Sequence, residues 1–420
     1  MKKLYKEVPS APVPKPLYPQ PSTMERELIA TQARQLKTRE QLLELLNCIK
    51  QDEMRKMGMG DSFFPFSMSH LTYYCNPNHA RKRYTRFEIK KKSGGVRIIT
   101  APRTANFKWL LRCVNVMLDA MYVPSCYAMG FTRGRSIVDN AQKHTGQNYV
   151  LNIDLKDFFP SIAQARVWGR LQVEPFNFSK DIASVLAGLC AMKDTAEDGA
   201  TRYVLPQGAP TSPIITNMVC DTLDRRLAGL AKRFGLCYTR YADDITFSSM
   251  HNVYHEHGEF LTELKRIIEG QRFAINEAKT RLQKVGARQE VTGLIVSKKV
   301  NVSKEYVRDL RNILFIWEHY GIGVARNKFY PRYKANKGHV KKGHPDMVNV
   351  IDGKLMYLKM VKGESDPVFQ RLYRKFQQLT EQTLPDGKVS PSPQRNDLDG
   401  LQDSLDLLLL EMDLDNLIND

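Results

Sequence analysis

Residues 236–248 read Leu-Cys-Tyr-Thr-Arg-Tyr-Ala-Asp-Asp-Ile-Thr-Phe-Ser, with two adjacent aspartates between two apolar runs. Aromatic and β-branched residues on both sides of Asp243 and Asp244 predict two strands joined by a tight acidic turn. Aspartate is common in turns because its side chain hydrogen-bonds the nearby backbone. The pair alone therefore also fits an ordinary turn, and its meaning depends on what other acidic residues accompany it.

A second predicted strand also ends in an aspartate. The apolar run from Tyr149 to Ile153 leads directly into Asp154. If the two strand ends are neighbours, three carboxylates gather in one place, and Mg²⁺ prefers such oxygen ligands together with substrate phosphates. Two Mg²⁺ ions about 3.5–4 Å apart can hold both the attacking and the leaving oxygen of a phosphoryl transfer. Three carboxylates at neighbouring strand ends can therefore hold the two metal ions that a phosphoryl transfer uses.

Four segments in order give the chain a resemblance to reverse transcriptases. They are an A-type motif at 154–159, a B-type motif at 205–213 (Leu-Pro-Gln-Gly-Ala-Pro-Thr-Ser-Pro), the C-type turn at 241–244 and a D-type motif at 276–280. Four ordered motifs are more specific than any single one, and the resemblance extends over roughly residues 25–373. It implies an α+β fold of the right-hand polymerase type, with fingers, a thumb, and a palm built on an antiparallel sheet with helices on one face. It also implies RNA-directed synthesis of DNA from deoxynucleoside triphosphates (dNTPs).

The resemblance assigns catalytic roles to particular residues. Asp154 and Asp243 are expected to contact two Mg²⁺ ions most directly, helped by the main-chain carbonyl of Leu155, while Asp244 lies partly behind them. Lys279 matches the D-motif lysine that protonates pyrophosphate, although a lysine at a helix end on the surface is an equally ordinary interpretation.

A second group of residues is expected to bind the incoming nucleotide. Backbone N–H groups of Asp157 and Phe158 would face the triphosphate, and Asp157 is left out of the metal set. Phe159 aligns with the aromatic steric gate that excludes a ribose 2′-hydroxyl, the alternative being a core aromatic. Further expected contacts are Gln207 and Gly208 in the B-type loop, and Arg97 and Lys91 in a basic hairpin, where Arg and Lys bind phosphate oxygens. The B-type loop also fits an ordinary loop into a capped helix, and the basic hairpin a solvated turn.

Two shorter segments resemble signatures of retron reverse transcriptases, which copy part of their own structured RNA into a branched RNA–DNA molecule (msDNA). Asn140-Ala141-Gln142-Lys143-His144 precedes the A-type motif, and Val291-Thr292-Gly293 follows the D-type motif. We therefore expect Asn140, His144 and residues 291–293 to contact RNA; a helix face and a strand-to-turn glycine are the plainer interpretations. The resemblance implies a cognate noncoding RNA as template, an RNA 2′-hydroxyl as primer, the RNA–DNA hybrid as product, a role in antiviral defence and a possible effector protein as partner.

The charge of the chain favours a polyanionic partner. The formal net charge is +18, and residues 385–420 hold nine acidic and two basic residues, which leaves +25 on residues 1–384. Neutralisation of phosphates dominates nucleic-acid affinity. Residues 324–375 hold thirteen Lys/Arg against four Asp/Glu, with aromatic side chains between them that can stack on unpaired bases. The residues expected to bind RNA here are Arg326, Lys328, Tyr333, Lys334, Lys341 and Lys342; a solvated helical surface over an aromatic core is the alternative.

Composition also bounds the setting of the protein. No apolar run approaches the roughly 20 residues that span a bilayer, and the first residues lack the apolar core of a signal peptide. Seven scattered cysteines form no Cys-x-x-Cys pair, which fits free thiols in a reducing cytoplasm. We expect a cytoplasmic protein without a membrane partner.

The predicted organisation follows the polymerase lobes: a Pro-rich arm (1–21), fingers with N-terminal helices (22–148), palm (149–296), basic thumb (297–383) and an acidic linker with a C-terminal helix (384–420). Strands are expected within 84–100 as a hairpin and around 150, 238, 246 and 294 in the palm. Helices are expected at 106–122, 180–191, 214–233, 259–271 and from 303 onward, with a helix start at the capping box of residues 38–41.

Three other functions fit parts of the pattern. Another bacterial defence-type reverse transcriptase, protein-primed or untemplated, would share the motifs. An intron maturase would add a Cys/His endonuclease module, which the sequence does not suggest. A non-catalytic RNA-binding scaffold would not need all of Asp154, Asp243, Asp244, Gln207 and Lys279, which are present.

Overall fold

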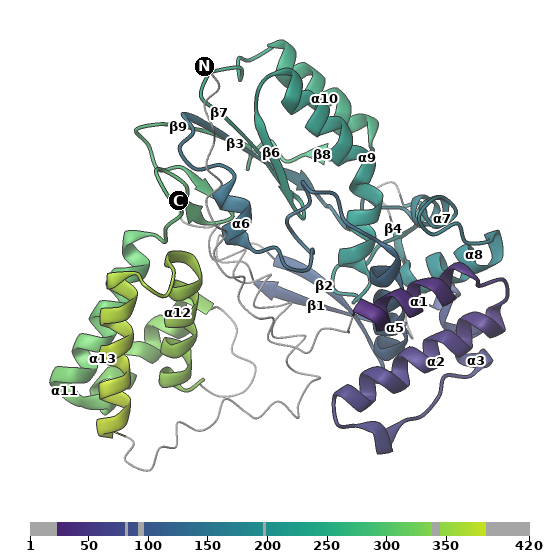
Figure 1. The fold of residues 1–420 in the computed structure, drawn as a ribbon, viewed down its shortest axis with the longest axis horizontal. Coiled ribbons are helices and arrows are strands. Elements are labelled where there is room, and N and C mark those ends of the chain that lie inside the picture. Colours follow the sequence, from purple (N-terminus) through teal and green to yellow (C-terminus); the bar gives the residue numbers. More distant parts are fainter. Residues whose placement is uncertain (1–22, 80–82, 91–95, 196–198, 338–344, 384–420) are drawn as a thin grey trace.

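The computed structural model describes residues 23–79, 83–90, 96–195, 199–337 and 345–383. Lys91, Lys341 and Lys342, the arm at 1–21 and the region 384–420 lie outside these ranges, so the predictions made for them stay predictions. The described part shows a helical region around α1–α3, a central sheet and a separate group of three C-terminal helices (Figure 1).

Helices account for most of the described chain. They are α1 (Thr23–Arg34), α2 (Arg39–Lys56), α3 (Met68–Tyr74), α5 (Ala105–Met121), α6 (Ile137–Gln142), α7 (Gln164–Leu171), α8 (Lys180–Cys190), α9 (Ser212–Arg233), α10 (Glu259–Gly270), α11 (Lys304–Lys337), α12 (Met347–Lys362) and α13 (Pro367–Thr383). The strands are β1 (Tyr84–Lys90), β2 (Val96–Pro102), β3 (Tyr149–Lys156), β4 (Met192–Thr195), β5 (Thr201–Val204), β6 (Cys237–Tyr241), β7 (Asp244–Ser249), β8 (Ala274–Ile275), β9 (Arg281–Lys284), β10 (Glu290–Val291) and β11 (Leu294–Ile295).

The N-terminal helices form where the sequence predicts a cap. Thr38 accepts from the backbone N–H of Gln41, whose side chain accepts in return from the backbone N–H of Thr38, so α2 begins at the predicted capping box. The buried face of α2 includes Leu42, Leu45, Leu46 and Ile49. Helices α1 and α2 pack on α5, which carries a row of fully buried apolar residues.

The predicted fingers hairpin is also present. β1 pairs antiparallel with β2 from Tyr84 opposite Pro102 to Lys90 opposite Val96. The backbone N–H of Thr100 in β2 donates to the Gln207 carbonyl at 2.7 Å. The hairpin is therefore anchored to the loop that precedes α9.

The central sheet is antiparallel and has β3 in its middle. Its order is β6-β7-β3-β8, and β9 also pairs with β3. The predicted palm strands around 150, 238 and 246 are β3, β6 and β7. The expected palm strand around 294 is not part of this sheet: residues 290–295 form a separate two-stranded hairpin, β10–β11, and β9 pairs with β3 instead. Two-residue strands with Thr292 and Gly293 both at positive φ leave too little extended chain to join the sheet.

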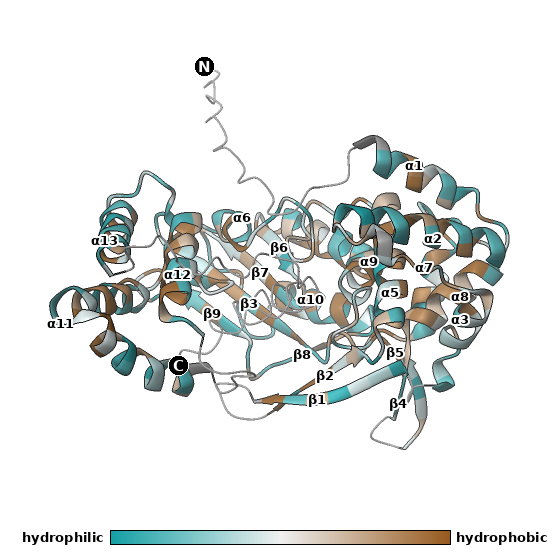
Figure 2. Cartoon of the chain, turned by 90° about the horizontal axis from the view of Figure 1, so that it is seen from below, coloured by the Kyte–Doolittle hydropathy of each residue, from teal (hydrophilic) through white to brown (hydrophobic). Residues whose placement is uncertain are grey.

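Helices α9 and α10 cover the sheet and pack on each other. Apolar residues gather along β3 and β7 in the centre of the molecule (Figure 2). The large hydrophobic core that results includes Ile153, Leu155, Ile245 and Phe247 of these strands and continues into α5 and α8. Burial on this scale is the main force that holds the strand ends in place.

The C-terminal helices have a second hydrophobic core of their own. Helix α11 is interrupted at Gly321, whose backbone is non-helical (φ 81°, ψ 165°), and both α11 and α12 pack on α13. This core also takes in Ile137, Ala141 and Val150 from the region before and within the sheet, so it crosses the predicted palm–thumb boundary. Tyr241 is partly buried and packs against both cores.

Candidate active site

The acidic turn lies at one end of the central sheet. The β6–β7 hairpin turns through Ala242 and Asp243, and Ala242 takes a left-handed backbone with φ of 55°. Asp244 lies opposite Asp154 of β3 in the strand register, and the Leu155 N–H donates to the Asp243 carbonyl at 3.0 Å. The structure thus brings the three aspartates together at neighbouring strand ends.

Polar and positively charged groups surround these carboxylates. The Asn276 side-chain amide donates to one oxygen of Asp154 at 2.9 Å, and the Lys279 ammonium donates to the other at 3.1 Å. Burial, together with the nearby Asp154 carboxylate, raises the pKa of the Asp243 carboxyl to about 6, while the charges of Lys279 and Arg97 act in the opposite direction. Two half-buried carboxylates therefore repel each other, with positive side chains nearby.

This donor set fits a divalent cation. All candidate ligand atoms are oxygens, and a bound cation would relieve the repulsion that raises the pKa of Asp243. Within the described ranges, no cluster of three or more His, Cys, Asp or Glu side chains is arranged to hold a metal by itself. Magnesium sites commonly combine one or two carboxylates with substrate phosphates, and Asp154 and Asp243 supply that minimum.

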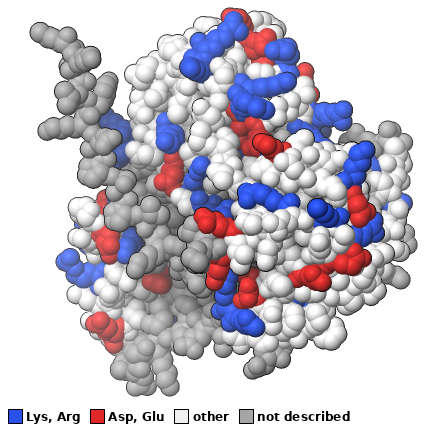
Figure 3. Space-filling view, turned by 45° about the vertical axis from the view of Figure 1, so that its right-hand side comes forward, with Lys and Arg blue, Asp and Glu red and all other residues white. Residues whose placement is uncertain are grey.

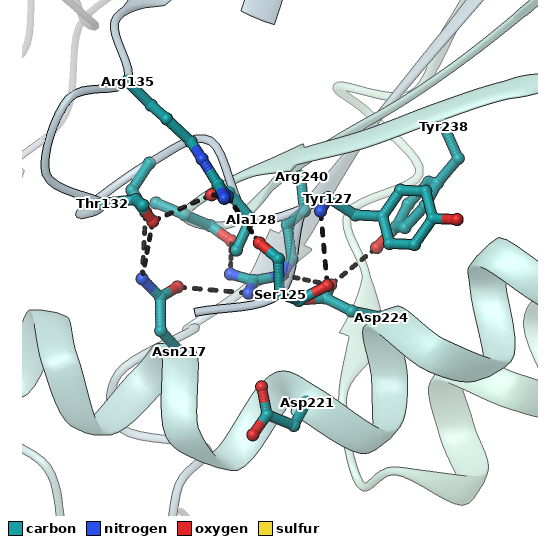
Figure 4. A network of polar contacts seen from close by, with 12 residues as sticks. Ser125, Tyr127, Ala128, Thr132, Arg135, Asn217, Asp221, Asp224, Tyr238 and Arg240 are labelled. Atoms are coloured by element: carbon teal, nitrogen blue, oxygen red, sulfur yellow. Dashed lines mark hydrogen bonds and ion pairs between the residues drawn. The ribbon is translucent and has the colours of Figure 1, made fainter. Parts of the chain in front are cut away.

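A buried ion pair holds the strand that leads into the turn (Figure 4). The Arg240 side chain is 0% exposed, and its Nε and Nη2 lie 2.7 and 2.8 Å from the two carboxylate oxygens of Asp224 in α9. Its Nη1 donates to the Ala242 carbonyl at 3.1 Å and its Nη2 to Asn217 Oδ1 at 3.2 Å. Burial alone would lower the pKa of Arg240, but the Asp224 carboxylate outweighs it and holds the pKa well above its usual value. Arg240 therefore stays charged and ties the turn to α9.

A loop formed by residues 125–135 lies directly against the turn. The Met129 N–H donates to the Arg240 carbonyl at 2.7 Å, and a β-carbon at Gly130 would lie only 2.6 Å from the Ala242 nitrogen. Thr132 and Arg135 both donate to the Ala128 carbonyl. Only glycine at position 130 allows the backbone of this loop to come so close to the backbone at Ala242.

Sequence reasoning missed this supporting layer. The sequence does contain an indication of Arg240's role, because a charged residue in an otherwise apolar, buried strand needs a partner of opposite charge. Asn217 and Asp224, seven residues apart in a predicted helix, share one helix face. Which of several acidic residues would meet Arg240 follows only from the packing of α9 on β6.

The A-type motif continues from β3 into a tight turn. Asp157 has a positive φ of 46° and an exposed side chain. The Phe158 ring is buried in the core, so only its backbone is available to a nucleotide. Phe159 is half-buried, and its ring centroid lies 5.6 Å from that of Phe158 and 6.2 Å from that of Phe131.

The B-type loop meets the fingers hairpin beside this motif. Gly208 has φ of 123°, and a β-carbon there would lie 2.9 Å from Ile99 and 3.2 Å from the Thr100 carbonyl. Gln207 and Arg97 are half-buried, and the positive charge of Arg97 acts to lower the pKa of Asp243. The B-type loop and the hairpin that carries Arg97 are therefore joined, and the role of these residues in binding a nucleotide stays a prediction; Lys91 is not described.

The two retron-type segments meet inside the protein. His144 donates to or accepts from Ser248 and Thr239 at 2.7 Å each, and the Asn140 amide contacts the Thr292 hydroxyl at 3.4 Å. Asn140, His144, Val291 and Thr292 are all buried, and Gly293 is half-buried at φ 71°. The expectation that the four buried side chains bind RNA is therefore wrong in this structure, because they contact one another and the sheet instead of solvent. They join α6 and the β10–β11 hairpin to the central sheet.

The basic C-terminal residues have mixed surroundings. Lys328 and Lys334 are exposed, while Arg326 lies 3.5 Å from Asp346 in an ion pair. Tyr333 is half-buried and stacks on the buried ring of Phe329. The two lysines have free surface for a phosphate backbone, whereas the Tyr333 ring is largely used in the second core.

Positive and negative side chains alternate on the face seen in Figure 3. Lys and Arg side chains form several separate groups there, with Asp and Glu side chains between them. No helix in the described ranges is long and apolar enough to cross a membrane.

Comparison with known proteins agrees with the motifs. The family model described as "Reverse transcriptase (RNA-dependent DNA polymerase)" matches residues 89–302. The chain is 36% identical to the Retron Mx65 reverse transcriptase of Myxococcus xanthus over 71% of this chain and 66% of that protein. It is 35% identical to the Retron Ec86 reverse transcriptase of Escherichia coli over 54% of this chain and 68% of that protein.

Other matches are shorter or more distant. The match to the Retron Mx162 reverse transcriptase of Myxococcus xanthus is 36% identical and covers 54% of this chain and 51% of that protein, so the chain spans less than two thirds of the length of the two Myxococcus relatives. A solved telomerase structure from Candida albicans has 11% identity and a TM-score of 0.39 over 74% of this chain and 66% of that one. On the family model and the retron relatives, the chain belongs to the reverse transcriptase family, as a bacterial reverse transcriptase of the retron type.

Proposed function

We propose that this chain is an RNA-directed DNA polymerase that uses dNTPs. The observation that carries the proposal is the meeting of Asp154, Asp243 and Asp244 at neighbouring strand ends. Phe159 and Gln207 are half-buried, and the Gln207 carbonyl accepts from the Thr100 N–H of the hairpin that carries Arg97. The three carboxylates are the donor set that metal-assisted phosphoryl transfer requires.

The metal ligands proposed are the carboxylates of Asp154, Asp243 and Asp244 and the Leu155 carbonyl, for two Mg²⁺ ions. When bound, such ions supply a primer hydroxyl of lowered pKa and neutralise charge on the triphosphate. Lys279 would give a proton from Nζ to the leaving pyrophosphate, and its contact with Asp154 supports a place next to that chemistry. The Arg240–Asp224 pair would hold the turn still while the reaction proceeds.

The nucleotide would be held from three sides. Arg97, and Lys91 by sequence, would bind phosphate oxygens. The backbone N–H groups of Asp157 and Phe158 would face the triphosphate. Gln207 and Gly208 would lie against the base and the template, and Phe159 would exclude a ribose 2′-hydroxyl.

The template proposed is a cognate structured noncoding RNA, primed from an RNA 2′-hydroxyl and copied into single-stranded DNA that stays attached as a branched molecule. The printed names of the relatives support the retron type, and exposed Lys328 and Lys334 support an RNA contact in the C-terminal region. A cytoplasmic location, a part in anti-phage defence and an effector protein partner belong to the same proposal.

A polymerisation assay with a matched variant tests the catalytic proposal. Asp243→Asn removes a metal-binding charge but little volume, so DNA synthesis should be lost while RNA binding and the melting temperature persist. The control is Asp181→Asn, an exposed aspartate on α8 that pairs with Arg39 and should leave synthesis unchanged. Synthesis near the wild-type rate in Asp243→Asn would show that the metal assignment is wrong.

Analysis of the natural product separates the alternatives. Nucleic acid co-purified with the protein should contain DNA joined to an RNA 2′-oxygen. DNA joined to a tyrosine, or DNA with no attachment, would instead indicate a protein-primed or untemplated enzyme. Bound RNA without any DNA, together with no Mg²⁺-dependent incorporation, would indicate a non-catalytic scaffold.

A further inference from the structure

Phe131 stands out because its backbone is strained and its ring is accessible. Its φ is 56°, in the left-handed region, and its side chain is 36% exposed. A bulky residue at positive φ is an outlier. Such strain persists only where the surroundings enforce it, and it concentrates at functional sites.

The surroundings of Phe131 do enforce this conformation. The Asn217 amide donates to the carbonyls of both Gly130 and Phe131, at 3.1 and 3.2 Å. Asn217 is itself held by Arg240, and Gly130 is pressed against the Ala242 nitrogen. Asn217 and Arg240, both labelled in Figure 4, therefore fix the backbone of Phe131 relative to the acidic turn.

The Phe131 ring meets the proposed gate residue. Its centroid lies 6.2 Å from that of Phe159 at an interplanar angle of 46°, within the range of favourable aromatic pairs. Phe158, the other aromatic neighbour of Phe159, is fixed in the core. A gate ring between two such neighbours has little freedom to turn away.

We propose that Phe131 is a positioning residue for sugar selection: it holds the ring of Phe159 in place, so that a ribose 2′-hydroxyl cannot push the ring aside. This inference rests on the proposed function, because it needs Phe159 to be the gate. Phe131 lies outside the four motifs. In this proposal, its strained backbone serves to set the position of its ring against Phe159.

The test measures the ratio of kcat/KM for dATP to that for ATP on a preformed primer–template. Phe131→Ala should lower this ratio by roughly tenfold, the scale at which small changes in fit alter discrimination. Phe131→Gly should lower it equally, because glycine accepts the positive φ while removing the same ring. If the alanine variant folds poorly, the glycine variant still tests the ring. Tyr127→Ala is the matched control: an equally exposed ring of the same loop that lies beside Tyr238 instead, and its ratio should equal that of wild type.

Combination with a gate variant decides whether Phe131 acts through Phe159. Phe159→Ala should lower the ratio more than either Phe131 variant, and adding Phe131→Ala to it should change nothing further. An unchanged ratio in both Phe131 variants, or an additional loss in the double variant, would overturn the inference while leaving the proposed function intact. If Phe159→Ala kept the wild-type ratio, the gate assignment itself would fail, and the inference with it.

Discussion

Removal of the Asp224 carboxylate should be among the most damaging single changes outside the metal ligands. In Asp224→Ala, the fully buried Arg240 loses both of its carboxylate contacts, at 2.7 and 2.8 Å, and Tyr238 loses its acceptor at 2.8 Å. The charge remains inside the protein with only two neutral oxygens, those of Ala242 and Asn217, as partners. Breaking a buried pair in this way costs about 3–5 kcal/mol, a large part of the roughly 5–15 kcal/mol that stabilises a typical domain.

An exposed pair of the same chemistry provides the comparison. Arg39 and Asp181 also form a two-oxygen contact, but their side chains are 41% and 50% exposed. Asp181→Ala should cost at most about 1 kcal/mol, because solvent screens exposed pairs. Urea unfolding of both variants, followed by circular dichroism, measures the two costs under the same conditions.

Replacing both Asp224 and Arg240 separates their effect on stability from their effect on the position of the acidic turn. Apolar residues in place of both partners, Asp224→Leu with Arg240→Met, should recover most of the lost stability, because neither buried charge remains. Polymerisation should stay reduced, since the contact from Arg240 to the Ala242 carbonyl is gone. Equal costs for Asp224→Ala and Asp181→Ala would refute the burial reasoning, and full activity in the double variant would refute the role of Arg240 in holding the turn.

Three further predictions follow from contacts described above. Burial lowers the pKa of His144 to about 3 from 6.5, so the folded state requires the neutral imidazole and loses stability as the pH falls below 6.5. Between that pH and about pH 5 the loss of unfolding free energy is about 2 kcal/mol. Urea titrations at several pH values measure this loss, and His144→Gln should abolish it. Gly130→Ala should reduce polymerisation strongly while Gly229→Ala, in α9 with open space around it, should not, although both stay folded by circular dichroism. Lys328→Glu with Lys334→Glu should weaken cognate RNA binding and lower its slope against salt by about two contacts, and an unchanged slope would place recognition elsewhere.

The sequence predicted the meeting of the aspartates better than the residues that support it. Asp154 and Asp243 could be named as candidate metal ligands because metal-assisted phosphoryl transfer restricts which side chains can stand at a strand end. The strands β3, β6 and β7 followed from the same runs. Asp224 and Asn217 could not be identified, because helical spacing predicts a shared face but not the residue that this face meets.

The retron-type segments show a different limit. Asn140 and His144 belong to a segment that resembles a retron signature, which suggested an RNA contact, yet both are buried with hydrogen-bond partners. A polar side chain in a short helix has no pattern that separates a satisfied buried position from an exposed one. The strand expected around 294 failed for a related reason, since periodicity over so few residues does not say which partner a strand will find.

The second hydrophobic core has a consequence for protein engineering. Ile137, Ala141 and Val150, which precede or lie within the palm, belong to one hydrophobic cluster with the C-terminal helices. A minimal polymerase cut before α11 would therefore expose this apolar surface to water and would tend to aggregate. Tyr241, the residue next to the acidic turn, packs against this same core. The C-terminal helices are in this sense a required part of the catalytic lobe, and shortened or chimeric versions should exchange them together with α6 and the β10–β11 hairpin.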